Sequence, residues 1–183
     1  MRTVRIKKPD QLKVQDFYQT HPFMVKCLCD NFDIQGTVLD PCAGGGIIAD
    51  NLSTNVEEMD LFPKLDRIVE KDFLSSENNS YDYIVMNPPY SNKYAFILKA
   101  LEVAQVVFVL LPLDVSNYNL FHREYLNTKQ YRGRLLMTPK VMLHSGVEMK
   151  KGGNSSYAWY EFSQEPNGDR KYEIYGDLNQ YAD

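Results

Sequence analysis

The stretch that most constrains the fold joins a short strand, a glycine-rich turn and a helix. Residues Gly36–Asp40 predict a strand, and the turn Pro41–Gly46 ends in three consecutive glycines. Residues Ile47–Leu52 predict the helix. Glycines let the backbone pass close to a ligand, and the N–H groups that open a helix can face it. We expect the first unit of a doubly wound α/β sheet, with a ligand at the turn.

The glycine turn lacks the features of two common phosphate-binding loops. It has no Walker lysine, and its spacing does not match the dinucleotide pattern G-x-G-x-x-G. Asp40 would repel a pyrophosphate but can accept hydrogen bonds from a cationic amino group. Asp60 ends the next predicted strand, 55–60, and lies 20 residues beyond Asp40. Nucleotide-binding βαβ units place a ribose-binding carboxylate at about that distance, although Asp60 could also be a plain strand-end acid.

The remaining pattern alternates strands and helices and then changes. Thr20 and Pro22 predict the N-cap and first turn of a helix that runs to about Asn31. A helix at 93–104 carries Tyr94, Ile97, Leu98 and Leu101 on one face. The other predicted elements are strands at 67–70, 81–86 and 106–111, a helix at 120–128, and longer strands at 131–143 and 157–162.

This order predicts one α/β domain over residues 1–183. Its sheet should be Rossmann-like and mostly parallel, with helices on both faces and a terminal antiparallel hairpin. A basic N-terminal arm, 1–16, and a polar C-terminal tail, 164–183, flank it.

The strand predicted at 81–86 runs directly into Asn87-Pro88-Pro89-Tyr90. The two prolines end the strand because neither ring nitrogen can donate to a sheet ladder. Asn87 is pushed to an extended backbone by the proline that follows it. The result is a stiff turn that carries an amide and an aromatic ring. On its own, this turn is as well explained by strand termination as by function.

Composition and charge restrict the setting. The net charge of −4 does not indicate a nucleic-acid binder, but basic residues gather at 1–8 and 129–151, so one face could be basic. An uneven solvated surface explains the charges equally well. No apolar run is long enough to span a bilayer. The odd set Cys27, Cys29 and Cys42 favours a reducing, cytoplasmic setting, and no Cys/His spacing predicts a metal site.

The two turns together resemble a known family. Asp40-Pro41-Cys42-Ala43-Gly44 with the glycines that follow, and then Asn87-Pro88-Pro89-Tyr90, are similar to the cofactor loop and catalytic tetrapeptide of the N6-adenine branch of class I S-adenosylmethionine-dependent methyltransferases. That branch includes small phage and bacterial DNA-modifying enzymes. Phe17–Pro22 resembles the family's F-Y-x-T-P segment, with one residue inserted between Thr20 and Pro22.

The resemblance implies a cofactor, a reaction and two sets of site residues. S-adenosyl-L-methionine would bind at Tyr18, Thr20, Asp40, Pro41, Cys42, Ala43, Gly44, Asp60, Asp72 and Phe73. Asn87, Pro88, Pro89 and Tyr90 would carry the transfer of a methyl group to an exocyclic amine. Asn87 and the Pro88 carbonyl would hold the amine hydrogens, and Tyr90 would stack on a flipped base. Asp60 would bind ribose, and Asp72 and Phe73 would flank the cofactor adenine, although Phe73 could simply be core.

The expected substrate is the N6 amine of adenine in DNA. RNA adenine and the glutamine side-chain amide of a protein remain open, since the same tetrapeptide serves all three, and so does a non-catalytic nucleic-acid-binding partner of this fold. At 183 residues the chain leaves no room for a recognition domain, so the basic stretches, a recognition subunit or a homodimer would have to supply recognition.

Overall fold

The computed structural model describes residues 18–77, 79–113, 130–138, 141–142, 150–151, 157–165 and 171–181. Its α-helices are α1 (Pro22–Asn31), α2 (Ile47–Asn51) and α3 (Lys93–Val103), and its 3-10 turns are η3 (Phe73–Ser75) and η6 (Leu178–Tyr181). Its strands are β1 (Val38–Asp40), β2 (Val56–Asp60), β3 (Val69–Glu70), β4 (Tyr81–Met86), β5 (Ala104–Pro112), β6 (Tyr131–Thr138), β7 (Val141–Met142), β8 (Lys150–Lys151), β9 (Tyr157–Ser163) and β10 (Tyr172–Asp177).

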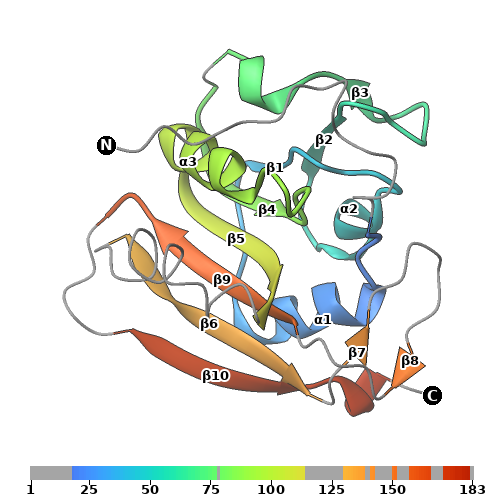
Figure 1. Ribbon diagram of the computed structural model, residues 1–183, viewed down its shortest axis with the longest axis vertical. Coiled ribbons are helices and arrows are strands. Elements are labelled where there is room, and N and C mark those ends of the chain that lie inside the picture. Colours follow the sequence, from blue (N-terminus) through green and yellow to red (C-terminus); the bar gives the residue numbers. More distant parts are fainter. Residues whose placement is uncertain are drawn as a thin grey trace.

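Eight strands form one sheet in the order β10-β6-β9-β5-β4-β1-β2-β3, and β7 pairs separately with β8. The strands from β3 to β5 pair in parallel. Strand β9 lies antiparallel between β5 and β6, and β10 adds a parallel strand beyond β6. Figure 1 shows β10 and β3 at the two ends of the sheet. The predicted mostly parallel sheet with a terminal antiparallel hairpin is confirmed.

Alternating side chains of the strands build a core on each face of the sheet. Ile84 and Met86 of β4 face one core cluster, which also contains Phe96 and Ile97 of α3. Val85, between them in sequence, faces a second cluster, to which α1 contributes four fully buried side chains. Helices therefore cover both faces, as expected (Figure 1).

The helices differ from the prediction in detail. His21, not Thr20, is the N-cap of α1, and its Nδ1 accepts a hydrogen bond from the Phe23 N–H. The inserted residue lets His21 take the place next to Pro22. On α3, Leu98 is 45% exposed, because the face that meets the sheet is centred on Phe96, Ile97 and small alanines.

The second half of the chain also departs from expectation. Strand β6 ends at Thr138, short of the predicted residue 143. Strand β10 was not predicted, since residues 164–183 were interpreted as a polar tail. The predicted helix at 120–128 and the arm at 1–16 lie outside the described residues.

Two kinds of feature are absent from the described part of the chain. None of its helices is long and apolar enough to cross a membrane. The same residues hold no group of three or more His, Cys, Asp or Glu side chains that could bind a metal ion.

Candidate active site

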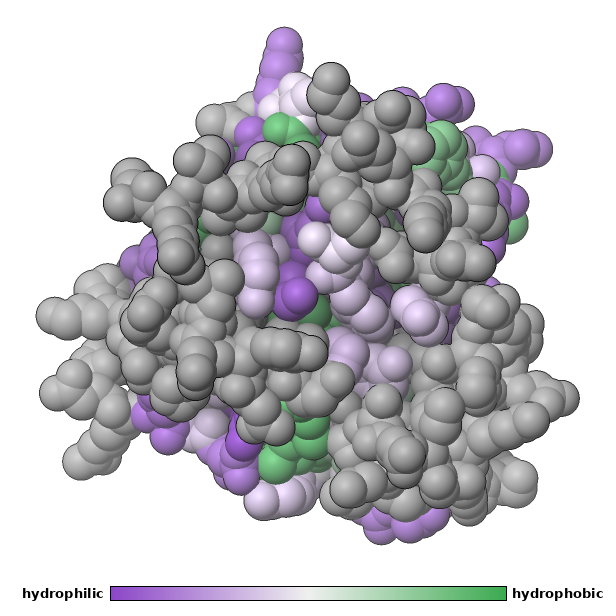
Figure 2. Space-filling model, viewed as in Figure 1, coloured by the Kyte–Doolittle hydropathy of each residue, from purple (hydrophilic) through white to green (hydrophobic). Residues whose placement is uncertain are grey.

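The two predicted motifs follow the carboxyl ends of neighbouring strands. Strands β1 and β4 pair in parallel, with Val38 opposite Tyr83 and Leu39 opposite Ile84. Parallel neighbours end at the same edge of a sheet, where α/β proteins bind their ligands. The sheet therefore brings the turn after Asp40 and the turn at Asn87 together. Figure 2 shows the face seen in Figure 1, and hydrophilic residues are visible near its middle.

Asp40 is buried at the start of the glycine turn and is 1% exposed. Its Oδ1 accepts a hydrogen bond from the Cys42 N–H at 3.0 Å, and no group in the described structure donates to its buried Oδ2. Burial raises the pKa of Asp40 well above its usual value, and the charges of Asp60 and Glu58 act in the same direction. Asp40 thus presents a buried acceptor that a cationic donor would stabilise.

Cys42, in the glycine turn, carries a free thiol. Burial and then the charge of Asp40 raise the pKa of the Cys42 thiol well above its usual range, which keeps the sulfur protonated. The side chain packs against the core cluster of α3. We therefore assign Cys42 no nucleophilic role.

The end of β2 holds the glycine turn in place. The Ala43 N–H donates to the Met59 carbonyl at 3.0 Å, and the Gly44 N–H donates to Asp60 Oδ2 at 2.8 Å. The other oxygen of Asp60 accepts the Phe62 N–H at 2.8 Å. Each carboxylate oxygen can accept a further bond, so Asp60 can still meet ribose hydroxyls.

Arg67 stabilises the same turn, a role that no motif in the sequence predicts. Its guanidinium donates to Glu58 at 2.8 Å, to Asp50 at 2.6 Å and to the Gly46 carbonyl at 3.3 Å. These partners come from β2, α2 and the turn itself. Arg67 therefore ties three elements together at the start of α2.

We expect Gly46→Ala to destabilise the protein by about 1–2 kcal/mol, because Gly46 has a φ of +75° and a side chain in this left-handed region is strained. The new Cβ would also collide with the Arg67 guanidinium. Urea unfolding measures the loss. Gly45→Ala is the matched control, since Gly45 lacks a positive φ and meets only the movable end of Gln19 at 2.9 Å. An equal cost for both variants would contradict this account.

Asp72 and Phe73 lie beside the end of β3. The Asp72 Oδ1 accepts the Leu74 N–H at 3.0 Å and caps η3. The Phe73 ring is 3% exposed and stacks on Phe96 of α3, with centroids 5.8 Å apart. The structure thus places Asp72 half-buried near the strand ends and puts the Phe73 ring in the core.

Asn87 is held by residues from the start of the described chain. Its Nδ2 donates to the Tyr18 carbonyl at 2.7 Å and to Thr20 Oγ1 at 3.2 Å. Its Oδ1 accepts the Tyr90 hydroxyl at 3.1 Å. Two acceptors face the NH₂ and one donor faces the oxygen, so the orientation of the amide is determined. The predicted cofactor residues Tyr18 and Thr20 therefore also contact the tetrapeptide.

Aromatic rings surround Tyr90. The ring of Tyr18 stacks on it with centroids 5.3 Å apart and planes 16° apart. Tyr157 of β9 lies tilted at 6.3 Å, and is itself buried. Lys93, at the start of α3, donates from Nζ to the Tyr90 carbonyl at 3.0 Å and lies over the Tyr94 ring. A cation and aromatic rings thus lie next to Tyr90, whose hydroxyl donates to the Asn87 amide oxygen.

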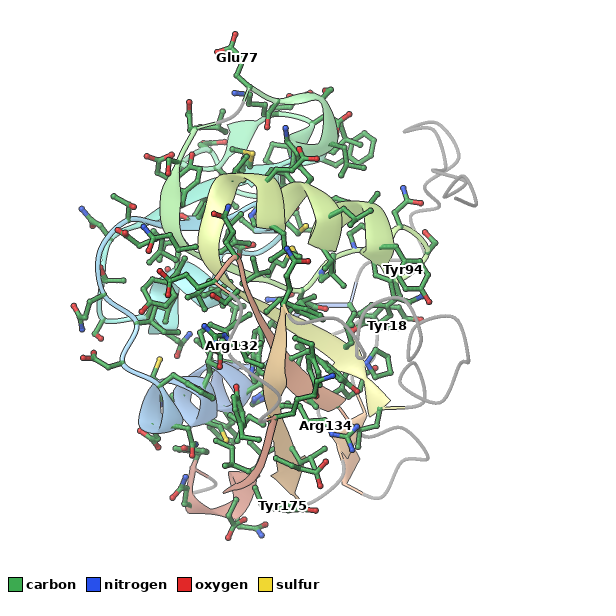
Figure 3. The ribbon with its side chains drawn as sticks, turned by 90° about the vertical axis from the view of Figure 1, so that its left-hand side faces the viewer. Tyr18, Glu77, Tyr94, Arg132, Arg134 and Tyr175 are labelled. Atoms are coloured by element: carbon green, nitrogen blue, oxygen red, sulfur yellow. The ribbon has the colours of Figure 1, made fainter. Side chains whose placement is uncertain are left out.

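The structure describes two cationic side chains of the predicted basic stretch at 129–151, Arg132 and Arg134. Arg134 pairs with Glu173 at 2.6 Å. Arg132 donates to Ser163 Oγ at 3.4 Å, next to the register shift between Tyr131 and Gly133 of β6. Figure 3 shows Arg132 and Arg134 well apart in its view, with Arg134 toward the side of Tyr18 and Tyr94.

Comparison with known proteins identifies the fold. No family model and no curated protein matches the sequence. Among solved structures, a candidate class I S-adenosylmethionine-dependent methyltransferase from Listeria monocytogenes aligns with a TM-score of 0.60 at 11% identity, over 87% of this chain and 64% of that one.

Two further structures align with somewhat lower TM-scores. The M protein of the type I restriction enzyme EcoKI gives a TM-score of 0.56 at 15% identity, over 90% of this chain and 49% of its own. A chain of the E. cuniculi Mtq2–Trm112 complex, which methylates the termination factor eRF1, gives a TM-score of 0.54 at 18% identity. That alignment covers 82% of this chain and 99% of the other. The fold is that of class I S-adenosylmethionine-dependent methyltransferases.

The residues at the strand ends fit the cofactor that this fold implies. The orphaned Oδ2 of Asp40 suits the amino group of a methionine moiety, and Asp60 suits ribose hydroxyls. The positive φ values of Gly44 and Gly46 allow a close approach of the backbone. S-adenosyl-L-methionine is the cofactor consistent with these groups.

Proposed function

We propose that this protein is an S-adenosylmethionine-dependent N-methyltransferase whose substrate is the N6 amine of adenine in DNA. The observation that carries the proposal is the orientation of Asn87. Its amide oxygen is turned toward Tyr90, beside the cofactor turn, while its NH₂ is held by Tyr18 and Thr20. An acceptor held in this way suits a planar amine.

An exocyclic amine is a poor nucleophile because its lone pair is delocalised into the ring. Asn87 Oδ1 has two acceptor positions, of which the Tyr90 hydroxyl uses one. The second can accept one amine hydrogen, and the Pro88 carbonyl the other. Holding both hydrogens orients the nitrogen lone pair and stabilises the positive charge that develops on nitrogen.

S-adenosylmethionine, when bound, supplies an electrophilic methyl group on a sulfonium. Asp40 and Asp60 would hold its two ends beside the glycine turn. Asn87 is uncharged and already a hydrogen-bond acceptor, so its role is to position the amine rather than to remove a proton. We also propose a reducing, cytoplasmic setting, since the three cysteines are free thiols.

Lys93 is suited to contact a phosphate next to the target base. Its Nζ lies 3.0 Å from the Tyr90 carbonyl and over the Tyr94 ring, which places a cationic group beside the residue that would stack on the target base. A phosphate contact gives affinity without sequence choice. Recognition of a particular sequence would then need a partner subunit or residues outside the described part.

We expect Lys93→Gln to weaken binding to a mixed-sequence 20-base-pair DNA duplex and to reduce the slope of log affinity against log salt by about 0.9. Fluorescence anisotropy at four salt concentrations measures this slope. Lys99→Gln is the control, because Lys99 also lies on α3 but pairs with Glu102 at 4.0 Å. An unchanged slope for Lys93→Gln would remove Lys93 from the DNA interface.

Two other substrates use the same chemistry. RNA adenine presents the same amine, and the glutamine amide of a protein presents a planar NH₂ beside a carbonyl. Radiolabelled methyl transfer to matched pools of DNA, RNA and protein distinguishes them, and we expect DNA to be labelled. Label in RNA or protein with none in DNA would contradict DNA as the substrate and identify the labelled pool as the acceptor. No label in any pool would favour a non-catalytic partner of this fold.

A further inference from the structure

The ring of Tyr18 stacks on Tyr90, the residue on which a planar substrate ring would stack under the proposed function. Tyr18 contacts the tetrapeptide twice: its backbone carbonyl accepts a hydrogen bond from Asn87 Nδ2 at 2.7 Å, and its ring stacks on the Tyr90 ring with centroids 5.3 Å apart. One residue therefore contacts both the amide that would hold the substrate amine and the ring that would stack on the substrate.

Of the two aromatic rings that the described part of the chain places against Tyr90, we infer that the Tyr18 ring is the one that can move. Tyr157 belongs to β9 and is 5% exposed within the core. Tyr18 precedes α1 and is only half-buried, and its backbone carbonyl, not its side chain, holds the Asn87 amide. Rotation about its side-chain bonds can remove the ring while the carbonyl keeps Asn87 oriented.

We propose that the Tyr18 ring occupies the substrate position on the Tyr90 ring when no substrate is bound. Only a flat aromatic ring that bears an amine can then displace it. The inference rests on the proposed function and narrows its substrate class. An adenine replaces one ring-on-ring contact by another and gives its amine hydrogen to the open position on Asn87 Oδ1. A glutamine side chain offers the amide but no ring, so it cannot compensate for the lost stack.

This exchange reduces apparent substrate affinity by the fraction of molecules in which Tyr18 has swung away. Removal of the ring should therefore tighten binding of an aromatic base. The backbone carbonyl remains in Tyr18→Ala, which separates the ring from the anchoring of Asn87. Tyr18→Phe is the matched control, because it keeps a stacking ring of the same shape.

The test is equilibrium binding of a single-stranded 12-mer of dA, which needs no knowledge of a target sequence, and of a base-free 12-mer. Tyr18→Ala should bind the dA 12-mer about two- to tenfold more tightly than wild type, the worth of one stacked aromatic pair. The affinity of Tyr18→Phe for the dA 12-mer should stay within about twofold of the wild-type affinity. Neither variant should change binding of the base-free oligomer.

Equal or weaker binding of the dA 12-mer by Tyr18→Ala would overturn the inference, and so would an equal gain for the base-free oligomer. The proposed function fails separately. If Tyr18→Ala tightens binding of dA but wild type methylates adenine only in RNA, the aromatic subsite stands and DNA is not the methyl acceptor. Methylation of a glutamine-containing peptide by wild type would overturn both the inference and the proposed function.

Discussion

Asn87→Asp should lose methyl transfer by roughly a hundredfold or more in kcat/KM, a loss of the size seen when one group that stabilises a transition state is removed. The family that the chain resembles accepts Asp, Asn or Ser at the first position of the tetrapeptide. Here the NH₂ of Asn87 faces the Tyr18 carbonyl at 2.7 Å and Thr20 Oγ1 at 3.2 Å. A carboxylate would place an oxygen against the carbonyl, with no hydrogen to donate.

The pH dependence of this variant gives a second readout. A protonated Asp at position 87 regains one O–H donor for the Tyr18 carbonyl, so the variant should recover part of its activity as pH falls. Thr20→Val, which removes the other acceptor and keeps the shape of the side chain, should cost less than Asn87→Asp. Steady-state kinetics with circular dichroism as a folding check measures both. Activity of Asn87→Asp within twofold of wild type would contradict the anchoring of the amide.

The second large effect concerns Asp40. We expect Asp40→Asn to weaken S-adenosylmethionine binding by roughly ten- to a hundredfold, since a hydrogen bond to a charged group contributes about 1.5–3 kcal/mol. The amide oxygen can still accept the Cys42 N–H, so the turn should keep its shape. Isothermal titration calorimetry measures the affinity. Asp82→Asn is the control. Asp82 accepts hydrogen bonds from Thr37 at the start of β4, at the end of that strand away from Asn87.

The raised pKa of Asp40 sets the direction of two pH effects. The ionised carboxylate attracts an amino cation, so cofactor affinity should increase as pH rises through that pKa and then level off. Without cofactor, folding stability should decrease as pH rises from the ordinary value toward the raised pKa, because the unfolded chain releases this proton first. Asp40→Asn should remove both dependences. Unchanged affinity in Asp40→Asn would exclude this carboxylate from the cofactor site.

The central strands were predictable because their signals are local. Gly36–Asp40 and Tyr81–Met86 are apolar runs followed by turn residues, and the structure places β1 and β4 within them. Strand β10 was missed because Glu173 and Tyr175 point outward and Gly176 interrupts the pattern. Gly176 is required by packing, since a Cβ there would collide with the Cys27 sulfur of α1.

The residue types of the site were predictable, but their partners were not. Asn87 meets Tyr18 and Thr20 across 69 and 67 residues of chain, and Arg67 meets Gly46 across 21. Contacts at such separations depend on how the sheet brings turns together, which no local pattern encodes. The resemblance implied that Phe73 would flank the cofactor adenine, but its ring packs on Phe96 of α3. Its position next to Asp72 in the sequence did not reveal this packing.

The most direct test of the proposed adenine-N6 methylation is nucleoside mass spectrometry of DNA incubated with the protein and isotopically labelled S-adenosylmethionine. We predict labelled N6-methyladenine in the wild-type reaction and none with Asn87→Ala. Label on cytosine, label that persists in Asn87→Ala, or label only in RNA or protein would contradict this account.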